Sequence, residues 1–411
     1  MLDELTILSR HFLRQGLQPW RRQPVREFPA HRRLTLLLGQ RGTGKTTALL
    51  QWLADGRPDW GSAPDILYVQ ADHVCMRERS LYTVAESFQQ LGGKRLAIDE
   101  IHQLPEWAAE LKSIHDTFPN LELLVSGSSA LELHQGSRDL SRRALVVRLP
   151  AMSFREFLEL RLGLELPVVS LDELLQQHEK RVPDVLAVLE VKGTKILAQF
   201  QDYHRFGCYP FFRNHPDAMQ FLQLLEQSMH TAIERDLLAI HPTLTGASAA
   251  KLKKLLAVMA RSVPFCPDLR GLKQLLDIGD ERTLKTYLIY LEQAGLLRQI
   301  SGSSRGLRAL EKPEKIYLDN PNQMHALHPV GPVDAGTRRE TFAAMMLAHS
   351  HRIIAPATGE FLVDDTITIE VGGRNKTASQ VRGRRNAWLA VDDTEHGVSR
   401  RIPLWWFGFL Y

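Results

Sequence analysis

The chain has 411 residues, 44% of them hydrophobic and 24% charged, with a formal net charge of +4; this composition is globular and the length allows two or three domains. The three cysteines are scattered and odd in number, which excludes a disulfide framework and a Cys/His metal site and suits a reducing cytoplasm. No apolar run approaches ~18 residues and the first residues are too polar for a signal peptide, so we expect neither a membrane span nor secretion.

Two segments of the chain are basic. Residues 1–33 form a basic N-terminal arm whose arginines cluster in 20–33, and residues 251–310 hold eleven Lys and Arg against five Asp and Glu. Such clusters can contact nucleic acid or an acidic neighbouring domain, and they can equally be solvated surface. The sequence leaves both interpretations open.

A phosphate-binding loop follows the basic arm. The apolar run 34–38 predicts a buried parallel strand, residues 39–46 fit G-x-x-x-x-G-K-[ST], and a helix continues to Gly56. The glycines allow backbone N–H groups to surround phosphates, Lys45 is expected to contact the β- and γ-phosphates, and Thr46 to ligate Mg²⁺. The residues predicted to bind ATP are Gly39, Gly42, Gly44, Lys45, Thr46 and Thr47.

A second motif, an acidic pair, lies at the end of a later apolar strand. In 95-RLAIDEIHQLPEW-107 the strand ends in Asp99 and Glu100. Downstream of a glycine loop, Asp99 is placed to hold the Mg²⁺ shell and Glu100 to orient or deprotonate the attacking water. We therefore predict Glu100 as a catalytic residue and Asp99 as a metal ligand.

Small polar residues and two arginines follow further along the chain. Ser126 and Ser128 end the strand 121–126, where a γ-phosphate sensor or a plain serine turn is expected. Arg142 and Arg143 precede the strand 144–149, and an arginine there can act on a neighbouring subunit's nucleotide or be surface charge. With strands at 34–38, 65–70, 96–98, 121–126 and 144–149, the sequence predicts a five-stranded parallel α/β sheet of P-loop NTPase type.

These motifs together resemble a large family of bacterial and archaeal AAA-type ATPases. The resemblance rests on 99-DEIHQLPEW-107, 125-VSGSSALEL-133, 206-FGCYPFF-212, 315-KIYLDNPNQMHAL-327 and 360-EFLVDDTITIEVGGRNK-376. It implies an AAA-type ATPase domain at 34–152, a helical lid at 153–245, a winged helix-turn-helix at 246–330, and a small α/β domain at 331–411 that is compared with the PD-(D/E)XK nuclease fold. The family has an arginine at the second basic position of its SRR run, which favours Arg143 over Arg142 as the finger.

The middle of the chain is predicted to be helical. We expect 153–245 to be a lid packed on the ATPase domain, followed by a short helix that ends at Gly279, a second helix from 282 to 294, and a wing around 301–312. Arg282, Thr283, Lys285 and Thr286 lie near the start of the second helix, where DNA contacts would come. Winged helices also dock proteins, so DNA contact remains one of two alternatives.

The hydrophobic pattern near the C-terminus fixes the register of a hairpin. A two-residue loop at 364–365 would place Glu360 and Glu370 on opposite faces, whereas a three-residue loop through Thr366 pairs Val363 with Ile367 and gathers the apolar residues on one face. We prefer the three-residue loop, which places Glu360 opposite Glu370. Two facing carboxylates need a cation, a shared proton or an arginine, and a Mg²⁺ ion would serve.

The nuclease-like chemistry of this hairpin is incomplete in sequence. Glu340 matches the family's acidic helix position, so Glu340, Glu360 and Glu370 form a speculative second metal site. Residue 372, where the lysine of such a site belongs, is glycine, although Lys376 could reach back. We therefore expect a degenerate nuclease-like domain. The apolar end, 401–411, is expected to be a buried terminal strand or an oligomer contact.

The sequence favours an ATP-binding, ATP-hydrolysing cytoplasmic protein that uses Mg²⁺ and acts on DNA through its winged helix and nuclease-like domains. Two alternatives are an ATP-gated Mg²⁺-dependent nuclease and a non-catalytic scaffold switched by ATP. No membrane partner is expected, and a homo-oligomer is compatible with the motifs.

Overall fold

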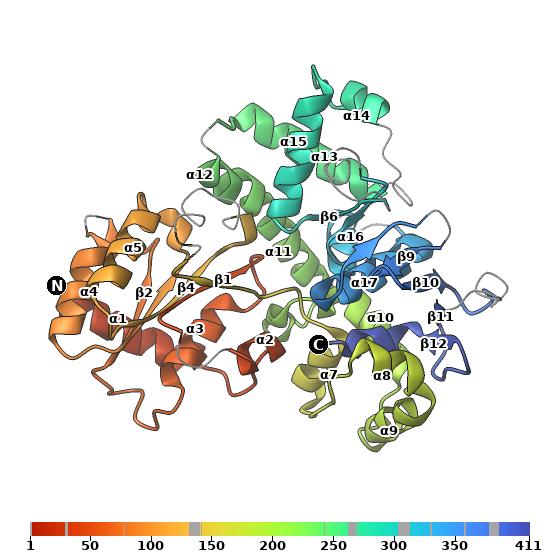
Figure 1. Cartoon of the computed structure of the whole chain (residues 1–411), viewed down its shortest axis with the longest axis horizontal. Coiled ribbons are helices and arrows are strands. Elements are labelled where there is room, and N and C mark those ends of the chain that lie inside the picture. The colour runs from red at the N-terminus through yellow and green to blue at the C-terminus, as the bar shows by residue number, and fades with distance from the viewer. Residues whose placement is uncertain are drawn as a thin grey trace. The chain divides into compact units, whose positions relative to one another are not determined.

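A computed structural model describes residues 2–28, 32–77, 79–130, 140, 142–241, 243–261, 269–302, 313–328, 331–356, 359–377 and 386–411. The chain forms two compact units (Figure 1). Unit 1 comprises residues 1–150, 231–249 and 293–295, and unit 2 comprises 151–230, 250–292 and 296–411.

Unit 1 contains a five-stranded sheet in the order β2-β3-β4-β1-β5, and every neighbouring pair is parallel. The strands are β1 (Leu34–Gly39), β2 (Ile66–Gln70), β3 (Arg95–Asp99), β4 (Glu122–Ser128) and β5 (Leu145–Arg148). The predicted parallel α/β sheet is confirmed, with strand ends within one or two residues of those expected. Strand β4 lies between β1 and β3, so its carboxyl end separates the glycine loop from the acidic pair.

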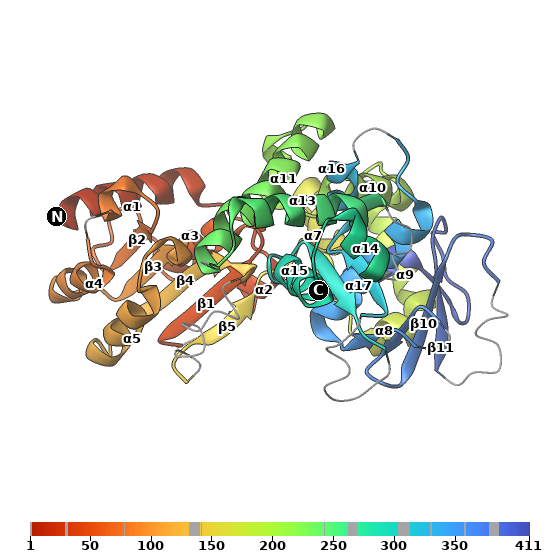
Figure 2. The same cartoon turned by 90° about the horizontal axis from the view of Figure 1, so that it is seen from above.

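Helices cover both faces of this sheet (Figure 2). They are α1 (Leu2–Gly16), α2 (Gln23–Arg26), α3 (Lys45–Ala54), α4 (Leu81–Gln90) and α5 (Trp107–Thr117), with short 3₁₀ turns η1 (Val74–Met76) and η2 (Ile101–Gln103). The crossover through α3 runs outward to β2, whereas α4 and α5 connect strands that return toward β1, so right-handed crossovers place α3 on one face and α4 and α5 on the other. Helix α1 packs beside β2, where the Tyr68 N–H donates to Ser9 Oγ at 2.9 Å.

Part of the basic N-terminal arm is built into unit 1. The Arg22 side chain is buried and donates to the carbonyl oxygens of Thr43 at 2.8 Å and Pro150 at 3.0 Å. Arg22 therefore stabilises the glycine loop through the Thr43 carbonyl. The number of basic residues in the arm does not reveal this structural role.

Three further elements follow in the part of unit 1 that comes from the middle of the chain: the π-helical turn η6 (Ala232–Leu237), α12 (Leu238–Ile240) and the start of α13 (Gly246–Arg261). Residues 231–245 of the expected lid and residues 246–249 of the expected winged-helix segment therefore belong to unit 1.

The remainder of the expected lid, residues 153–230, belongs to unit 2. Its elements are α7 (Phe154–Leu162), α8 (Leu171–Gln176), α9 (His178–Val191), α10 (Ile196–Asp202), η4 (Tyr203–Gly207), η5 (Pro210–Asn214) and α11 (Ala218–Thr231). The Phe154 ring packs against Phe200, Tyr203 and Phe409, and Phe200 packs edge-on against Phe342. These aromatic contacts join the expected lid to the C-terminal segment. Sequence periodicity predicts that a helix face is buried, but it does not predict which element covers that face.

Four helices and a hairpin of the described residues lie in 246–330, where a winged helix is predicted. They are α13, α14 (Leu269–Leu275), α15 (Glu281–Gln293), and the antiparallel pair β6 (Leu297–Ile300) and β7 (Lys315–Leu318), followed by α16 (Pro321–Leu327). Helices and strands thus occur in the expected order. Most of the predicted wing, residues 303–312, lies outside the described residues.

The C-terminal segment forms a second five-stranded sheet in the order β12-β11-β10-β9-β8. Its elements are α17 (Ala335–Ser350), β8 (Ile353–Ile354), β9 (Phe361–Val363), β10 (Ile367–Gly372), β11 (Ala387–Val391), β12 (Arg401–Pro403) and the 3₁₀ helix η9 (Leu404–Phe409). Strand β9 pairs with β10 in the preferred register, Val363 opposite Ile367 and Phe361 opposite Ile369. The apolar end is buried, as expected, although only 401–403 are a strand.

Among the described residues, no helix combines the length and the apolar character that a membrane span requires.

Candidate functional site

The glycine loop of unit 1 connects β1 to α3 in a conformation that requires glycine. Gly42 and Gly44 have φ values of 82° and 96°, in the left-handed region that side chains disfavour. A Cβ at residue 39 would lie 2.6 Å from the carbonyl oxygen of Leu149. These three glycines therefore let the backbone turn sharply around the space in front of α3.

Helix α3 presents its amino end to this loop. Gly44 is its N-cap, and no side chain of the described residues caps it, so the first-turn N–H groups are available to phosphate oxygens. The Lys45 ammonium donates to the carbonyl oxygens of Gly39 and Gln40, both at 3.0 Å. Thr47 occupies the third position of the helix. The predicted ATP-binding residues thus lie together around one loop.

Asp99 is the centre of a buried hydrogen-bond network at the carboxyl end of β3. Thr46 Oγ1 donates to its Oδ2 at 2.6 Å and Tyr68 Oη donates to the same oxygen at 2.8 Å, while Ser126 Oγ donates to Oδ1. Burial raises the pKa of Tyr68 and the charge of Asp99 raises it further, so the phenol stays a donor. A hydroxyl and a carboxylate adjacent at the end of the glycine loop fit the shell of a Mg²⁺ ion.

Glu100 follows Asp99 with its backbone in the left-handed region, at φ 54° and ψ 44°. For a non-glycine residue this conformation is uncommon and clusters at functional sites. The Glu100 N–H donates to Ser126 Oγ at 3.1 Å, and its Oε2 lies 3.5 Å from Nε2 of His102. Ser126 therefore fixes both acidic residues, one through its hydroxyl hydrogen and the other through its oxygen.

The two remaining predicted catalytic residues, Ser128 and Arg143, lie in different surroundings. Ser128 is buried at the end of β4, in register with Gly39 of β1, which keeps it beside the loop. Arg143 is bound within its own chain, donating through Nε and a terminal nitrogen to the two carboxylate oxygens of Asp116, each at 2.8 Å. Those hydrogen bonds hold the pKa of Asp116 below its usual range. A finger role for Arg143 would require this ion pair to open.

Three residues of the site were not found by sequence motifs. Arg41 lies in a variable position of the glycine loop and forms a two-point ion pair with Asp236 of η6, at 3.0 and 2.7 Å. His102 has a fully buried side chain and lies 3.4 Å from Asp236. No spacing rule connects residue 236 with residue 41, so only the fold reveals this cluster.

The structure brings the three C-terminal carboxylates together through two lysines. Lys315 of β7 contacts Glu360 and lies 3.7 Å from Glu340, while Lys376 lies 3.1 Å from Glu370 and 3.9 Å from Glu360. Burial raises the pKa of Glu340, and the charge of Glu360 adds to this rise. The carboxylates are thus offset by ammonium groups in this arrangement.

The Lys376 side chain runs through the space that a side chain at position 372 would need. A Cβ at Gly372 would lie 2.1 Å from Cδ of Lys376, and the Lys376 ammonium donates to Glu370 at 3.1 Å. Within the described chain, no three His, Cys, Asp or Glu side chains are arranged to hold a metal ion. The second metal site therefore remains a prediction.

The helix expected to contact DNA has a well-formed amino end. Asp280 accepts from the N–H and the hydroxyl of Thr283, both at 2.8 Å, and Lys285 lies 3.0 Å from Glu281. Arg282 is exposed beside them, and Thr286 donates to the Arg282 carbonyl at 2.9 Å. Most of these polar groups are engaged locally, so DNA contact remains a prediction.

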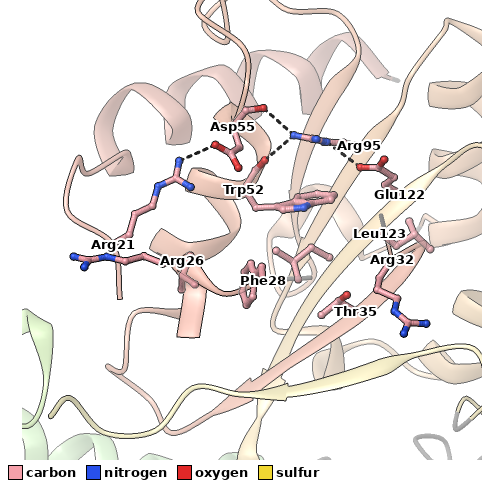
Figure 3. A pocket seen from close by; sticks show the side chains of 12 residues that line it. Arg21, Arg26, Phe28, Arg32, Thr35, Trp52, Asp55, Arg95, Glu122 and Leu123 are labelled. Atoms are coloured by element: carbon pink, nitrogen blue, oxygen red, sulfur yellow. Dashed lines mark hydrogen bonds and ion pairs between the residues drawn. The ribbon is translucent and has the colours of Figure 1, made fainter. Parts of the chain in front are cut away.

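A basic pocket of about 180 Å³ lies at the amino ends of β1, β3 and β4, opposite the glycine loop (Figure 3). Arg21 lies 3.2 Å from Asp55, and Arg95 lies 2.9 Å from Glu122 and over the ring of Trp52. These arginines are neutralised within the pocket, which distinguishes it from the phosphate-binding loop.

Comparisons with known proteins agree with the fold of unit 1. Residues 31–158 match a family described as an AAA domain, residues 197–333 match a domain of unknown function, and no curated protein matches the chain. Residues 31–158 thus match the AAA-domain family, and the parallel five-stranded sheet of unit 1 fits the α/β architecture of a P-loop NTPase domain.

Similar solved structures include the Aeropyrum pernix ORC1 protein in complex with DNA, at 16% identity and a TM-score of 0.30, covering 80% of this chain and 91% of that chain. AMPPCP-bound DnaA from Aquifex aeolicus has 14% identity and a TM-score of 0.27, covering 71% and 91%. C. elegans PCH-2 has 15% identity and a TM-score of 0.24, covering 70% and 68%.

Proposed function

We propose that this protein is an ATPase of the AAA type whose site is formed by the glycine loop and the acidic pair of unit 1. The observation that carries the proposal is the contact between Thr46 Oγ1 and Asp99 Oδ2, at 2.6 Å, beside an uncapped helix amino end. This is the arrangement in which a hydroxyl and a carboxylate can share one Mg²⁺ ion next to phosphates.

The residues divide the work of hydrolysis among themselves. The loop N–H groups and Lys45 bind the phosphates, with Lys45 leaving the carbonyl oxygens that it contacts in the structure. Thr46 and Asp99 would hold Mg²⁺, which would offset charge on the phosphate oxygens. Glu100 orients a water molecule and accepts its proton on a carboxylate oxygen. Ser128 and Arg143 are further candidates for contact with the γ-phosphate, Arg143 on the nucleotide of a neighbouring subunit.

The test is phosphate release and fluorescent-ATP binding by wild type and Glu100→Gln. We expect the variant to bind ATP with wild-type affinity and to lose at least ~100-fold in turnover, as general base removal costs. Glu106→Gln is the matched control because Glu106 is exposed in the same unit. Wild-type turnover in Glu100→Gln would contradict the assigned role.

We further propose that the protein uses ATP turnover to act on DNA, through its winged helix and its C-terminal domain. We propose also that it is cytoplasmic and can form homo-oligomers. Support comes from the helix-turn-helix order of α14 and α15 before an antiparallel hairpin. Stimulation of the ATPase rate by duplex DNA tests this step, and a rate independent of DNA would favour a scaffold that ATP switches.

A second candidate function is ATP-gated, Mg²⁺-dependent nucleic-acid cleavage by the C-terminal domain. The position of Lys376 favours it, because its ammonium lies beside Glu370 although residue 372 lacks a side chain. Cleavage of plasmid DNA that disappears in Glu370→Gln and in Lys376→Ala would support this candidate. Intact DNA under all Mg²⁺ and ATP conditions would leave the domain without catalysis.

A further inference from the structure

A buried cluster connects the glycine loop with the carboxylate that is proposed to activate water. Asp236 is 1% exposed and receives both the Nε and a terminal nitrogen of Arg41, at 3.0 and 2.7 Å. Arg41 belongs to the glycine loop, two residues after Gly39. Two-point pairing of this kind fixes the direction of both side chains, so the position of Asp236 depends on the conformation of the loop.

His102 lies between Asp236 and Glu100. Its side chain is 0% exposed, and its Nε2 is 3.4 Å from Asp236 Oδ1 and 3.5 Å from Glu100 Oε2. Its Nδ1 accepts the N–H of Ser128 at 3.4 Å, so in the neutral ring the proton resides on Nε2. One N–H therefore faces two carboxylates.

The Nε2 atom of His102 lies beyond normal hydrogen-bond distance of both carboxylates. Glu100 Oε2 and His102 Nε2 are both buried without a hydrogen-bond partner among the described residues. Both distances from Nε2 exceed those of a normal hydrogen bond, which lie at about 2.7–3.2 Å. A small rotation of the ring toward either carboxylate would bring Nε2 within hydrogen-bond distance of it.

The charge balance keeps Asp236 ionised beside the histidine. Burial raises the pKa of Asp236, but His102 and Arg41 outweigh burial and lower it to about 2. The negative charge of Asp72 also raises the pKa of Arg41, and Arg235 lies 3.9 Å from Asp72. An ionised Asp236 therefore lies 3.4 Å from the Nε2 atom of His102.

We propose that His102 and Asp236 are positioning residues for Glu100. The Nε2–H of His102 holds the Glu100 carboxylate where it accepts the proton of the attacking water, Asp236 fixes the ring, and Arg41 ties this arrangement to the phosphate-binding loop. This inference rests on the proposed ATPase function. The cluster then links the conformation of the phosphate-binding loop to the position of the Glu100 carboxylate.

The test compares His102→Phe, which keeps a ring but removes the donor, with His102→Gln, whose Nε2 amide can donate from a similar place. We expect His102→Phe to lower kcat by ~10–100-fold, the usual cost of losing such a partner, with KM and fluorescent-ATP affinity within about twofold of wild type. His102→Gln should recover most of kcat. Asp236→Asn should lower kcat as His102→Phe does, and His11→Phe, on exposed α1, is the control.

The decisive measurement is the double variant Glu100→Gln with His102→Phe in single-turnover hydrolysis. A positioning residue that acts through Glu100 adds no further loss beyond about twofold. A further tenfold loss, unchanged kcat in His102→Phe, or failure of His102→Gln to recover activity would overturn the inference while wild-type turnover upholds the ATPase proposal. Absence of turnover in the wild type would instead overturn the ATPase proposal itself.

Discussion

Removing one oxygen atom from Tyr68 tests how Asp99 is held. Tyr68 and Asp99 are 2% and 1% exposed, and the phenol donates to the carboxylate at 2.8 Å. A hydrogen bond to a charged group contributes about 1.5–3 kcal/mol. Because Thr46 and Ser126 also donate to Asp99, we expect Tyr68→Phe to cost the lower end of this range, about 1.5 kcal/mol.

Two assays should detect this loss. Hydrogen exchange of the β3 peptide reports local stability of the sheet, and a loss of 1.5 kcal/mol corresponds to about tenfold faster exchange through unfolding. Mg²⁺ titration of ATP turnover reports the orientation of Asp99, and the half-saturating Mg²⁺ concentration should rise several-fold because the carboxylate gains freedom to rotate.

Tyr82→Phe is the matched control, since Tyr82 lies on α4 of the same unit and its ring packs against that of Phe118. Its removal of a hydroxyl should leave both readings within twofold of wild type. The reasoning would be refuted by wild-type exchange and wild-type Mg²⁺ dependence in Tyr68→Phe, because a buried, charge-assisted hydrogen bond could not then exist at this position.

Three further outcomes follow from single positions. Lys45→Ala should abolish ATP binding in a fluorescent-nucleotide titration, and retained affinity would contradict the assigned loop. Gly39→Ala should lower the unfolding midpoint and weaken ATP binding, since overpacking costs about 1–3 kcal/mol, whereas Gly61→Ala, with no atom within 4 Å of its Cβ, should change neither. Gly372→Ala should displace Lys376 from Glu370 and raise its acetylation rate by mass spectrometry, and an unchanged rate would contradict the observed contact.

Local sequence patterns were sufficient to predict the parallel sheet of unit 1. Continuous apolar runs such as 34–38 predict buried parallel strands, and the polar residues that end them must meet at one edge. The structure accordingly brings Thr46, Asp99 and Ser126 into contact. In the C-terminal hairpin, alternation alone fixed the register, because a one-residue shift would have exposed Phe361 and Ile369.

Long-range partners could not be predicted in this way. Arg41 and Asp236 are 195 positions apart, and neither charge has a spacing that indicates the other. The aromatic residues of the expected lid showed a buried face, but nothing in their spacing indicated that Phe342 and Phe409 cover it. Partner choice depends on the packing of whole elements, which a single sequence does not encode locally.

The Lys376 side chain runs through the space in front of Gly372. With 2.1 Å between the Lys376 Cδ and a Cβ at residue 372, a side chain at 372 would need the space that Lys376 now uses. The ammonium group beside Glu370 therefore comes from six positions further along the chain, and a search for acid-x-lysine spacing overlooks it.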